Sequence, residues 1–407
     1  MLRLGIVADD LTGAMDSGVQ LAKWGLQTLV LLISQGLPEA DALVLSTDSR
    51  GASPAEAYRR ANAAARRLKG RTLYKKMDSA MRGNVGQELD GVLDAVGLQR
   101  ALVAPAAPFA GRATVNGCHR VNGVPVAETD FARDPVAPVT ESHLPSLLAR
   151  QTRRKVGHLP LRVVEQGAEA VTAALVAEPA TVVAADAVEP RHLWTLALAL
   201  QRQPEPWLPC GSAGLAEAWT ACLGLSRPEI NGPAWPSDGR PVLIISGSRH
   251  SATLAQLKRA ESEELLQLVH LAPPAGLEQA SHWSHAAEGT LAELEAGHNV
   301  ALTLSFSAYV EGQQQAAAEA LAQAAAWVLE HAQPAGLFVT GGDTLQALCH
   351  TLGSSALLIV GEVQPGVPAG RLVLGSGKEP RIVTKAGAFG DDQTVVRCIH
   401  FIQGRQT

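Results

Sequence analysis

Residues 73–89 read LYKKMDSAMRGNVGQEL, and this stretch shows how the region around it is expected to fold. An apolar run ends in two adjacent lysines, and an aspartate, a serine and an arginine follow soon after. Gly83 and Asn84 then precede a helical pattern of apolar residues. A short buried run, a polar turn and a helical repeat are typical of a strand-to-helix connection. Why so many strong hydrogen-bonding groups gather at one strand end has to be explained by the rest of the chain.

The same alternation of strand and helix continues on both sides of this stretch. Residues 2–8, 42–50 and 100–106 read as further strands. Residues 53–70 form a well-marked helix, with Ser53 as N-cap, a proline at the first helical position and a glycine after the last turn. Strands that alternate with helices predict a parallel, doubly wound sheet.

The length of 407 residues exceeds the usual size of a single hydrophobic core. Periodicity disappears at 226–240, where three prolines occur, and the alternation of strand and helix then resumes. We therefore expect a substrate domain at 1–225, a linker at 226–240 and a nucleotide-binding domain at 241–407. Both domains are expected to be α/β, each with a largely parallel sheet and flanking helices.

Composition excludes several classes of protein. The net charge is −5 without a basic block, so no nucleic-acid partner is expected. The five cysteines are scattered and form no C-x-x-C pair, which is typical of reduced thiols rather than of disulfides or zinc. No apolar run approaches the ~20 residues of a membrane helix, and the N-terminus shows no signal-peptide pattern. These patterns predict a cytoplasmic protein without a membrane partner, and they leave the oligomeric state open, a homodimer included.

Three predicted strands of the first half end in polar side chains. These ends are Asp9-Asp10, Asp48-Ser49-Arg50 and Lys75-Lys76-Met77-Asp78-Ser79. Parallel strands end at one edge of a sheet, where doubly wound folds bind ligands. Helix capping would explain the aspartates and serines, but it does not call for Arg50 or Lys76. An arginine fork, a lysine charge and carboxylate acceptors together predict a pocket for a small polyhydroxylated anion. Arg50 would hold its carboxylate; the alternative is an ion pair of Arg50 with Asp48 or a nearby helix.

Residues 105–135 are rich in proline and glycine and are predicted to form a long irregular loop, of the kind that is usually functional or disordered. Arg112 in this loop could hold a phosphate or carboxylate, or it could pair with Glu128 or Asp134. His119 is the only histidine of the loop and is expected to be a structural hydrogen-bond donor.

Glycine-rich turns follow strands of the second half at 246–256, 339–348 and 384–393. Such turns offer backbone N–H groups and the positive end of a helix to a phosphate. Each turn alone could be a plain tight connection, and neither the P-loop pattern nor the dinucleotide pattern occurs. The three turns together predict phosphate binding through a less common set of loops, and the two halves together suggest phosphoryl transfer to a small acid.

Several motifs in fixed order also carry a resemblance to a known family. They are ADDLTGAMD at 8–16, KKMDSAMRGNVGQE at 75–88, GRATVNG at 111–117, GS at 247–248, GGDT at 341–344, PGVP at 365–368 and KAGAFG at 385–390. These motifs span nearly the whole chain, and through them the protein resembles the four-carbon acid sugar kinases. It is most similar to the D-threonate kinase branch, with the 3-oxo-tetronate kinases next.

The resemblance implies ATP-dependent, Mg²⁺-assisted phosphorylation of the 4-hydroxyl of a sugar acid. D-threonate is the first expectation, and 3-oxo-tetronate and D-erythronate are the alternatives; a sugar-acid dehydrogenase or a metabolite sensor is the alternative of another class. By motif position, the implied substrate-binding residues are Asp10, Arg50, Lys76, Met77, Asp78 and Ser79. The implied ATP-binding residues are Ser248, Gly341, Gly342, Asp343, Thr344 and Gly387.

Asp10 and Asp78 are the candidate catalytic residues, with Asp10 preferred as the general base, and the metal ligands stay unknown. Ala80 stands where the family usually has threonine, so a hydroxyl is missing beside the expected substrate. This departure bears on the identity of the acid more than on the reaction.

Overall fold

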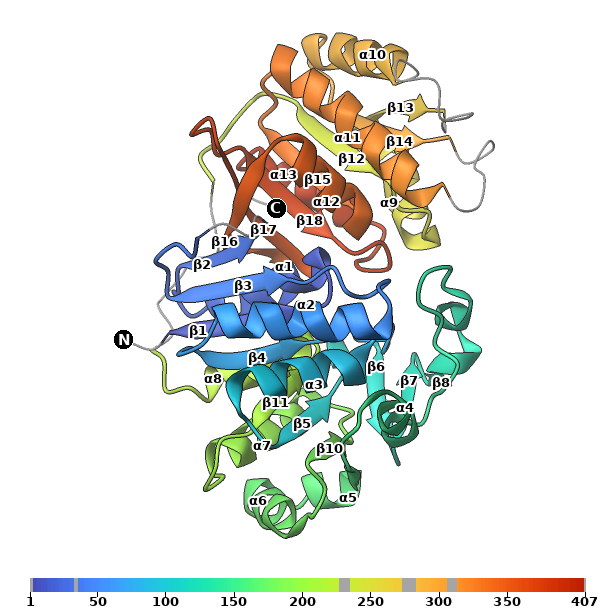
Figure 1. Ribbon diagram of the computed structural model, residues 1–407. Coiled ribbons are helices and arrows are strands. Elements are labelled where there is room, and N and C mark those ends of the chain that lie inside the picture. The colour runs from blue at the N-terminus through green and yellow to red at the C-terminus, as the bar shows by residue number, and fades with distance from the viewer. Residues whose placement is uncertain (1–2, 33–35, 227–234, 273–282, 306–312, 406–407) are drawn as a thin grey trace. The chain divides into compact units, whose positions relative to one another are not determined.

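A computed structural model shows two compact α/β units, and Figure 1 gives the course of the chain. One unit comprises Met1–Val30 and Gln35–Pro228, and the other comprises Leu31–Ser34 and Glu229–Thr407. The structure describes residues 3–32, 36–226, 235–272, 283–305 and 313–405. Most of the linker predicted at 226–240 therefore lies outside the described residues.

The N-terminal unit is built on a mainly parallel sheet with the strand order β2-β3-β1-β4-β11-β5-β10-β9. Its strands are β1 (Leu4–Ala8), β2 (Thr28–Leu31), β3 (Ala42–Ser46), β4 (Thr72–Lys76), β5 (Ala101–Ala104), β9 (Val156–Leu159), β10 (Val182–Ala185) and β11 (Leu208–Gly211). β1 runs parallel to both β3 and β4, and Ala8 lies level with Ser46 and Lys76. The three polar strand ends predicted from the sequence therefore meet at one edge of this sheet.

Helices cover both faces of this sheet, as Figure 1 shows for α2 and α3 on the nearer face. The helices are α1 (Leu11–Ala22), α2 (Pro54–Arg67), α3 (Val85–Val96), α4 (Leu144–Gln151), α5 (Leu161–Val164), α6 (Ala168–Ala177), α7 (Pro190–Gln201) and α8 (Ala213–Ala221). α2 packs on α3, and α1 and α7 pack on α8. Ser53 caps α2 by accepting a hydrogen bond from Glu56 N, as its sequence predicts. The α/β prediction is confirmed for this unit.

β11 was not predicted, although it occupies the centre of the sheet between β4 and β5. It spans only four residues and contains Pro209, and both features argue against a central strand in a sequence. Proline fits here because its carbonyl can still accept hydrogen bonds although its nitrogen cannot donate one.

The loop predicted at 105–135 is not irregular. It carries β6 (Arg112–Val115), β7 (Cys118–Val121) and β8 (Val124–Pro125), which form a three-stranded antiparallel sheet, and short helical turns η1 (Pro108–Ala110), η2 (Val126–Glu128) and η3 (Asp130–Arg133). Asn-Gly pairs at 116–117 and 122–123 connect the strands with positive φ angles. Such pairs are a strong hairpin signal that could have revealed this small sheet in the sequence. Residues 105–135 are called the arm below.

The sheet of the C-terminal unit has the order β13-β14-β12-β15-β18-β17-β16. Its strands are β12 (Val242–Ser246), β13 (Gln267–Leu271), β14 (Val300–Leu304), β15 (Gly336–Thr340), β16 (Ser354–Gln364), β17 (Val367–Leu374) and β18 (Arg381–Lys385). The first five strands of this order, from β13 at the edge to β18, pair in parallel with their neighbours. β17 pairs antiparallel with both β18 and β16. β12, β15 and β18 end where the three glycine-rich turns begin, as the sequence predicts.

The helices of this unit are α9 (Ser251–Ser262), α10 (Ser284–Glu295), α11 (Gln314–His331), α12 (Gly342–Thr351) and α13 (Thr394–Ile402). α9 packs on α13, whereas α11 packs on α10 and α12. A core of apolar side chains, including Trp235, Phe338 and Ile399, holds α9 and α13 against the sheet. The prediction of a second α/β domain is confirmed.

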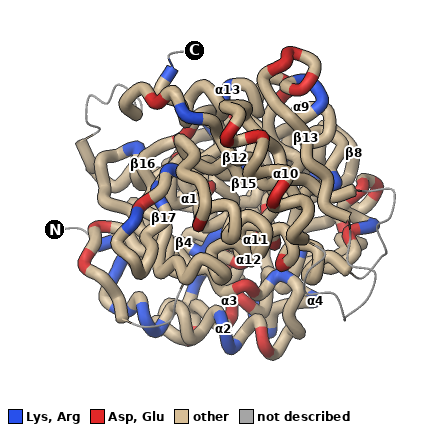
Figure 2. The backbone as a smooth tube through the Cα atoms, turned by 90° about the horizontal axis from the view of Figure 1, so that it is seen from above, with Lys and Arg blue, Asp and Glu red and all other residues tan. Residues whose placement is uncertain are grey.

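Charged residues of both signs are distributed along the described chain, as Figure 2 shows. Arginines lie on α2 and acidic residues on the adjacent α3, where the Tyr58 hydroxyl donates a hydrogen bond to Asp94. None of the described helices is both long and apolar enough to span a membrane. All five cysteines are free thiols, as predicted.

Candidate functional site

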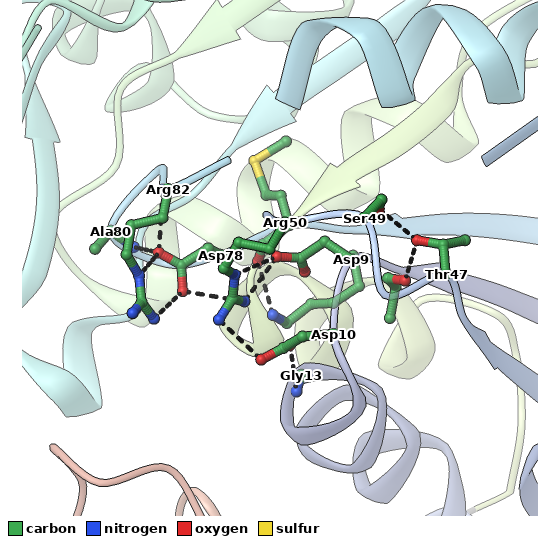
Figure 3. Close-up of polar contacts among 12 residues, drawn as sticks. Asp9, Asp10, Gly13, Thr47, Ser49, Arg50, Asp78, Ala80 and Arg82 are labelled. Carbon is green, nitrogen blue, oxygen red and sulfur yellow. Dashed lines mark hydrogen bonds and ion pairs between the residues drawn. The ribbon is translucent and has the colours of Figure 1, made fainter. Parts of the chain in front are cut away.

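The guanidinium of Arg50 lies at the centre of the polar edge of the N-terminal sheet (Figure 3). Its Nη1 is 2.8 Å from Asp10 Oδ2, and its Nη2 is 2.7 Å from Asp9 Oδ2 and 3.4 Å from Asp78 Oδ1. Three carboxylates from two strand ends therefore surround one arginine. Asp48, the alternative partner considered from the sequence, lies 3.7 Å from Arg60 instead.

Asp78 is held on several sides. Arg82 donates to both of its oxygens, at 3.0 and 2.9 Å, and the backbone N–H groups of Ala80 and Arg82 donate to Oδ2. Arg82 also donates to Asp134 at 3.0 Å. Burial alone would raise the pKa of Asp78, but Arg82 and Arg50 outweigh it and hold that pKa well below its usual range. Asp78 therefore stays ionised, and both of its oxygens accept hydrogen bonds from the protein. This suits a fixed hydrogen-bond acceptor better than a general base.

Asp10 is the most accessible of the three carboxylates. Its side chain is 20% exposed, against 4% for Asp9 and 9% for Asp78. Its Oδ1 caps helix α1 by accepting a hydrogen bond from Gly13 N at 2.8 Å. A β-carbon at Gly13 would lie 2.6 Å from this oxygen and 2.8 Å from Lys76 Nζ. Glycine at this position therefore lets the lysine ammonium and the aspartate approach the same point.

The two remaining residues that were predicted to bind the substrate at this edge are Met77 and Ser79. Met77 is buried, and its N–H donates to Gly211 O of β11 at 2.9 Å. The carbonyl of Ser79 accepts a hydrogen bond from His119 Nε2 at 2.7 Å, so this imidazole donates from Nε2. Its Nδ1 then accepts from the Thr114 hydroxyl at 2.9 Å. His119 is thus the structural donor that the sequence suggested, and it fixes the turn on which Ser79 lies.

Arg112 of the arm is also buried, and its Nη1 donates to the carbonyl of Ala110. Its guanidinium lies 5.8 Å from the centre of the Phe131 ring, and that of Arg82 lies 5.3 Å from the same centre. Asp134 bonds to Arg82, as described above. The arm therefore supplies one aromatic ring and one carboxylate that hold the arginines of the site in place.

The segment RGNVGQE at 82–88 packs against the loop that carries Ser49 and Arg50 and holds it in place. Gly83 packs so tightly that a β-carbon there would lie 3.1 Å from Arg50 O, and its φ of 88° also favours glycine. Asn84 donates to Ser49 O at 3.0 Å. Glu88 accepts from the Ser49 hydroxyl at 2.6 Å and pairs with the fully buried Lys75 at 2.8 Å.

This arrangement explains the density of polar groups in residues 73–89. Asp78 and Lys76 face the site, whereas Lys75, Asn84 and Glu88 hold the loop that carries Arg50. Lys75 was predicted only as part of a polar strand end, and Glu88 and Arg82 had no predicted role. The helical spacing of Asn84 and Glu88, one turn apart, is the signal that could have placed both on one face of α3.

The three glycine turns of the C-terminal unit meet at the carboxyl ends of β12, β15 and β18. A β-carbon on Gly387 would overlap Ser248 Oγ, and one on Gly341 would lie 3.2 Å from Thr344 Oγ1 and 3.5 Å from Ser248 N. Gly341 also has a φ of 108°, which side chains rarely adopt. Backbone from three loops therefore approaches closely without side chains in between. Gly342 and Asp343 open helix α12, so four of the six predicted nucleotide residues, 341–344, lie at its N-terminus, and Ser248 lies close to Gly341 and Gly387.

Comparison with known proteins gives the class of each unit. Residues 4–219 match a family of sugar-binding N-terminal domains, and residues 243–395 match a family of nucleotide-binding C-terminal domains. A solved structure from Salmonella typhimurium LT2, described as a putative tRNA synthase, has a TM-score of 0.81 and 25% identity, and covers 98% of this chain and 99% of its own.

Relatives over the whole length give the family. A D-threonate kinase of Salmonella typhimurium is 34% identical and covers 99% of both chains. A D-erythronate kinase of Heliobacterium modesticaldum is 32% identical over 99% of this chain and 97% of its own. A 3-oxo-tetronate kinase of Brucella melitensis is 31% identical over 96% and 94%. The chain belongs to the four-carbon acid sugar kinases, and it is a phosphotransferase rather than the dehydrogenase or sensor considered as alternatives.

Proposed function

We propose that the protein transfers the γ-phosphoryl group of ATP to the 4-hydroxyl of D-threonate. The observation that carries this proposal is the group of carboxylates and cations around Arg50. A four-carbon acid presents one carboxylate and several hydroxyls, and this edge offers cationic donors and anionic acceptors within a few ångströms of one another. The relative named D-threonate kinase is the most similar of the three compared, which favours this acid over D-erythronate and 3-oxo-tetronate.

Asp10 is the proposed general base. It is the most exposed carboxylate of the edge, and its partner Nη1 of Arg50 is also the group proposed to hold the substrate carboxylate. An incoming carboxylate would compete with Asp10 for this arginine and would leave Oδ2 of Asp10 free to accept the proton of the attacking hydroxyl. Both proposed roles are thereby compatible with the ion pair seen without substrate.

Asp78, Lys76 and Ser79 are proposed to bind the hydroxyls and the charge of the acid, and Met77 to form a wall of the pocket. Ala80 is buried, and its N–H donates to Asp78 Oδ2. The methyl side chain that replaces the usual threonine therefore offers no hydroxyl to the acid. This difference supports testing all four-carbon isomers rather than one.

ATP is proposed to bind the glycine turns through Ser248, residues 341–344 and Gly387. Phosphoryl transfer requires positioning and charge neutralisation more than covalent help from the protein. Mg²⁺ fits this site in the way it usually binds nucleotides, through phosphates, waters and one or two carboxylates. Asp343, exposed in the first turn of α12, would supply a carboxylate oxygen. When bound, Mg²⁺ neutralises phosphate charge.

The test is a coupled assay of ADP release with Mg²⁺ and each four-carbon acid isomer. We expect the highest kcat/KM for D-threonate and no activity with the uncharged four-carbon polyol, which lacks the carboxylate. Absence of ADP release with every tetronate would refute the kinase proposal, and preference for another isomer would refute only the choice of acid. A need for ATP supports a cytoplasmic location. The homodimer stays a prediction, which light scattering can check.

A further inference from the structure

Lys385 is a buried lysine that the proposed reaction does not use. It is the last residue of β18 and leads directly into the turn that carries Gly387. Its side chain is 1% exposed. Its Nζ donates to Thr253 Oγ1 at 2.9 Å, to Ala386 O at 3.2 Å and to Gly387 O at 3.1 Å. The ammonium is thus saturated with hydrogen bonds, but every acceptor is a neutral oxygen.

The charge of Lys385 has no anionic partner within the described part of the chain. The other ionisable groups near it are Cys398 of α13 and His250, which caps α9 beside Gly387. Burial raises the pKa of the Cys398 thiol to about 12, so this group is neutral. Burial also lowers the pKa of Lys385 to about 8. The buried Lys75 of the N-terminal unit differs, because Glu88 neutralises it at 2.8 Å.

Two more polar groups lie on the same face of the sheet as Lys385. Thr340 pairs with Lys385 in the strand register, and Ser246 pairs with Thr340. Register partners in a parallel sheet point to the same side. The hydroxyls of Thr340 and Ser246 are buried and find no hydrogen-bond partner among the described residues. A polar row therefore runs across β12, β15 and β18 where their three glycine turns begin.

The hydrogen bonds of Lys385 also fix the shape of one of these turns. The Gly387 carbonyl accepts from both Lys385 Nζ and the Thr253 hydroxyl, the latter at 2.8 Å. This holds the carbonyl towards α9 and leaves the Cα of Gly387 against Ser248. Without these two donors, nothing else that the structure describes would hold the carbonyl in this direction.

We propose that Lys385 is a positioning residue for the nucleotide, which pins the Gly387 turn and receives its missing counter-charge from the bound phosphates. This inference rests on the proposed nucleotide site, and it adds a residue and a charge coupling to that site. An anion seated on the turns favours the ammonium over the neutral amine, because opposite charges stabilise each other strongly in a buried environment.

Proton uptake is the expected consequence. A lysine whose pKa is about 8 is about half protonated at that pH in the free protein. Nucleotide binding raises its pKa, so at about pH 8 each binding event should take up about half a proton. Affinity should be constant below the free pKa and fall as the pH rises through it. The terminal phosphate of ADP is already ionised in this range, because its second pKa is about 6.

The experiment is titration calorimetry of ADP into the full-length protein with constant Mg²⁺, at about pH 8 and about pH 6.5, in buffers of different ionisation enthalpy. The variants are Lys385→Met and, as the matched control, Lys378→Met, an exposed lysine of the connection between β17 and β18. We expect uptake of about half a proton at the higher pH for the wild type and Lys378→Met only. Lys385→Met should bind ADP about tenfold more weakly or worse.

The outcomes separate this inference from the proposed function. If the wild type binds no nucleotide at all, the proposed function fails. If the wild type binds ADP and Lys385→Met binds it equally well with the same proton uptake, the inference about Lys385 is wrong and the nucleotide site stands. Thermal unfolding without nucleotide shows whether Lys385→Met is folded. Should it not fold, wild-type uptake decides, because the absence of any uptake near pH 8 contradicts the proposed coupling.

Discussion

The two candidate sites lie at the same kind of place, the carboxyl ends of parallel strands, but they hold charge in opposite ways. In the N-terminal unit, Asp9, Asp10 and Asp78 surround Arg50, and Arg82 binds Asp78 from the other side. In the C-terminal unit, glycine turns expose backbone, and Lys385 bonds only to neutral oxygens. A hydroxylated acid requires both donors and acceptors, whereas a phosphate requires donors alone. The difference therefore matches the ligand proposed for each unit.

The largest effect is expected for Asp10→Asn. Asparagine caps helices as well as aspartate does, so α1 should stay intact. Loss of a general base lowers kcat by about 10²–10⁴-fold. Steady-state kinetics with saturating acid and ATP would measure the change. A variant that alters only the KM for the acid would show that Asp10 binds the substrate and does not take its proton.

Arg50→Ala is expected to act on the acid alone. Removing one partner of a desolvated charge pair typically costs about 2–5 kcal/mol, which is a loss of more than about tenfold in kcat/KM for the acid. The KM for ATP should stay unchanged. Arg59→Ala is the control, because Arg59 is an arginine whose side chain is 72% exposed on α2. Equal loss for both ligands would contradict the separation of the two sites, provided that circular dichroism shows a folded variant.

Gly387→Ala and Gly341→Ala should show the opposite pattern. The added methyl group meets Ser248 or Thr344 and would intrude where the nucleotide approaches. Overpacking of about 1–3 kcal/mol corresponds to a rise of about 5- to 150-fold in the KM for ATP. Gly375→Ala is the matched control, because a β-carbon there meets no atom within 4 Å. A rise in the KM for the acid alone would place these turns in the wrong site.

The smallest effect concerns the pH dependence of stability. Burial lowers the pKa of His119 to about 4, against about 6.5 in an unfolded chain. Between these values the unfolded state binds more protons, so the free energy of unfolding falls as the pH drops, by up to ~1.4 kcal/mol per pH unit. Urea unfolding of the wild type and His119→Gln at about pH 7 and about pH 5 would measure this. An equal acid-induced loss in both proteins would show that His119 does not contribute.

The sequence was sufficient where local pattern and sheet geometry agree. Buried runs followed by polar turns placed Asp10, Arg50 and Asp78 at neighbouring strand ends, and the structure brings them within contact of one another. The sequence was not sufficient to predict elements whose structure depends on contacts with distant parts of the chain. β11 is short and contains Pro209, and both features argue against a central strand in the sequence, yet it pairs on both sides within the sheet.

The partners of charged side chains were the second feature that the sequence did not predict. Nothing in the sequence indicates that Arg82 binds Asp78 and Asp134 together, because Asp134 comes from the distant arm. Likewise, Lys385 could not be recognised as buried without the packing of α9 and α13 over the end of β18. Spacing along the chain gives the partners within one helix or turn, but not those that meet only after folding.

The proposed reaction transfers the γ-phosphoryl group of ATP to the primary hydroxyl of a four-carbon acid. The most direct measurement is the proton-coupled ³¹P NMR spectrum of a reaction of the wild-type protein with ATP, Mg²⁺ and D-threonate, with Asp10→Asn beside it. We expect a new phosphate monoester signal split by the two protons of a CH₂ group with the wild type, and almost none with the variant. An unchanged ATP spectrum, or a monoester signal split by a single proton, would contradict the proposed reaction.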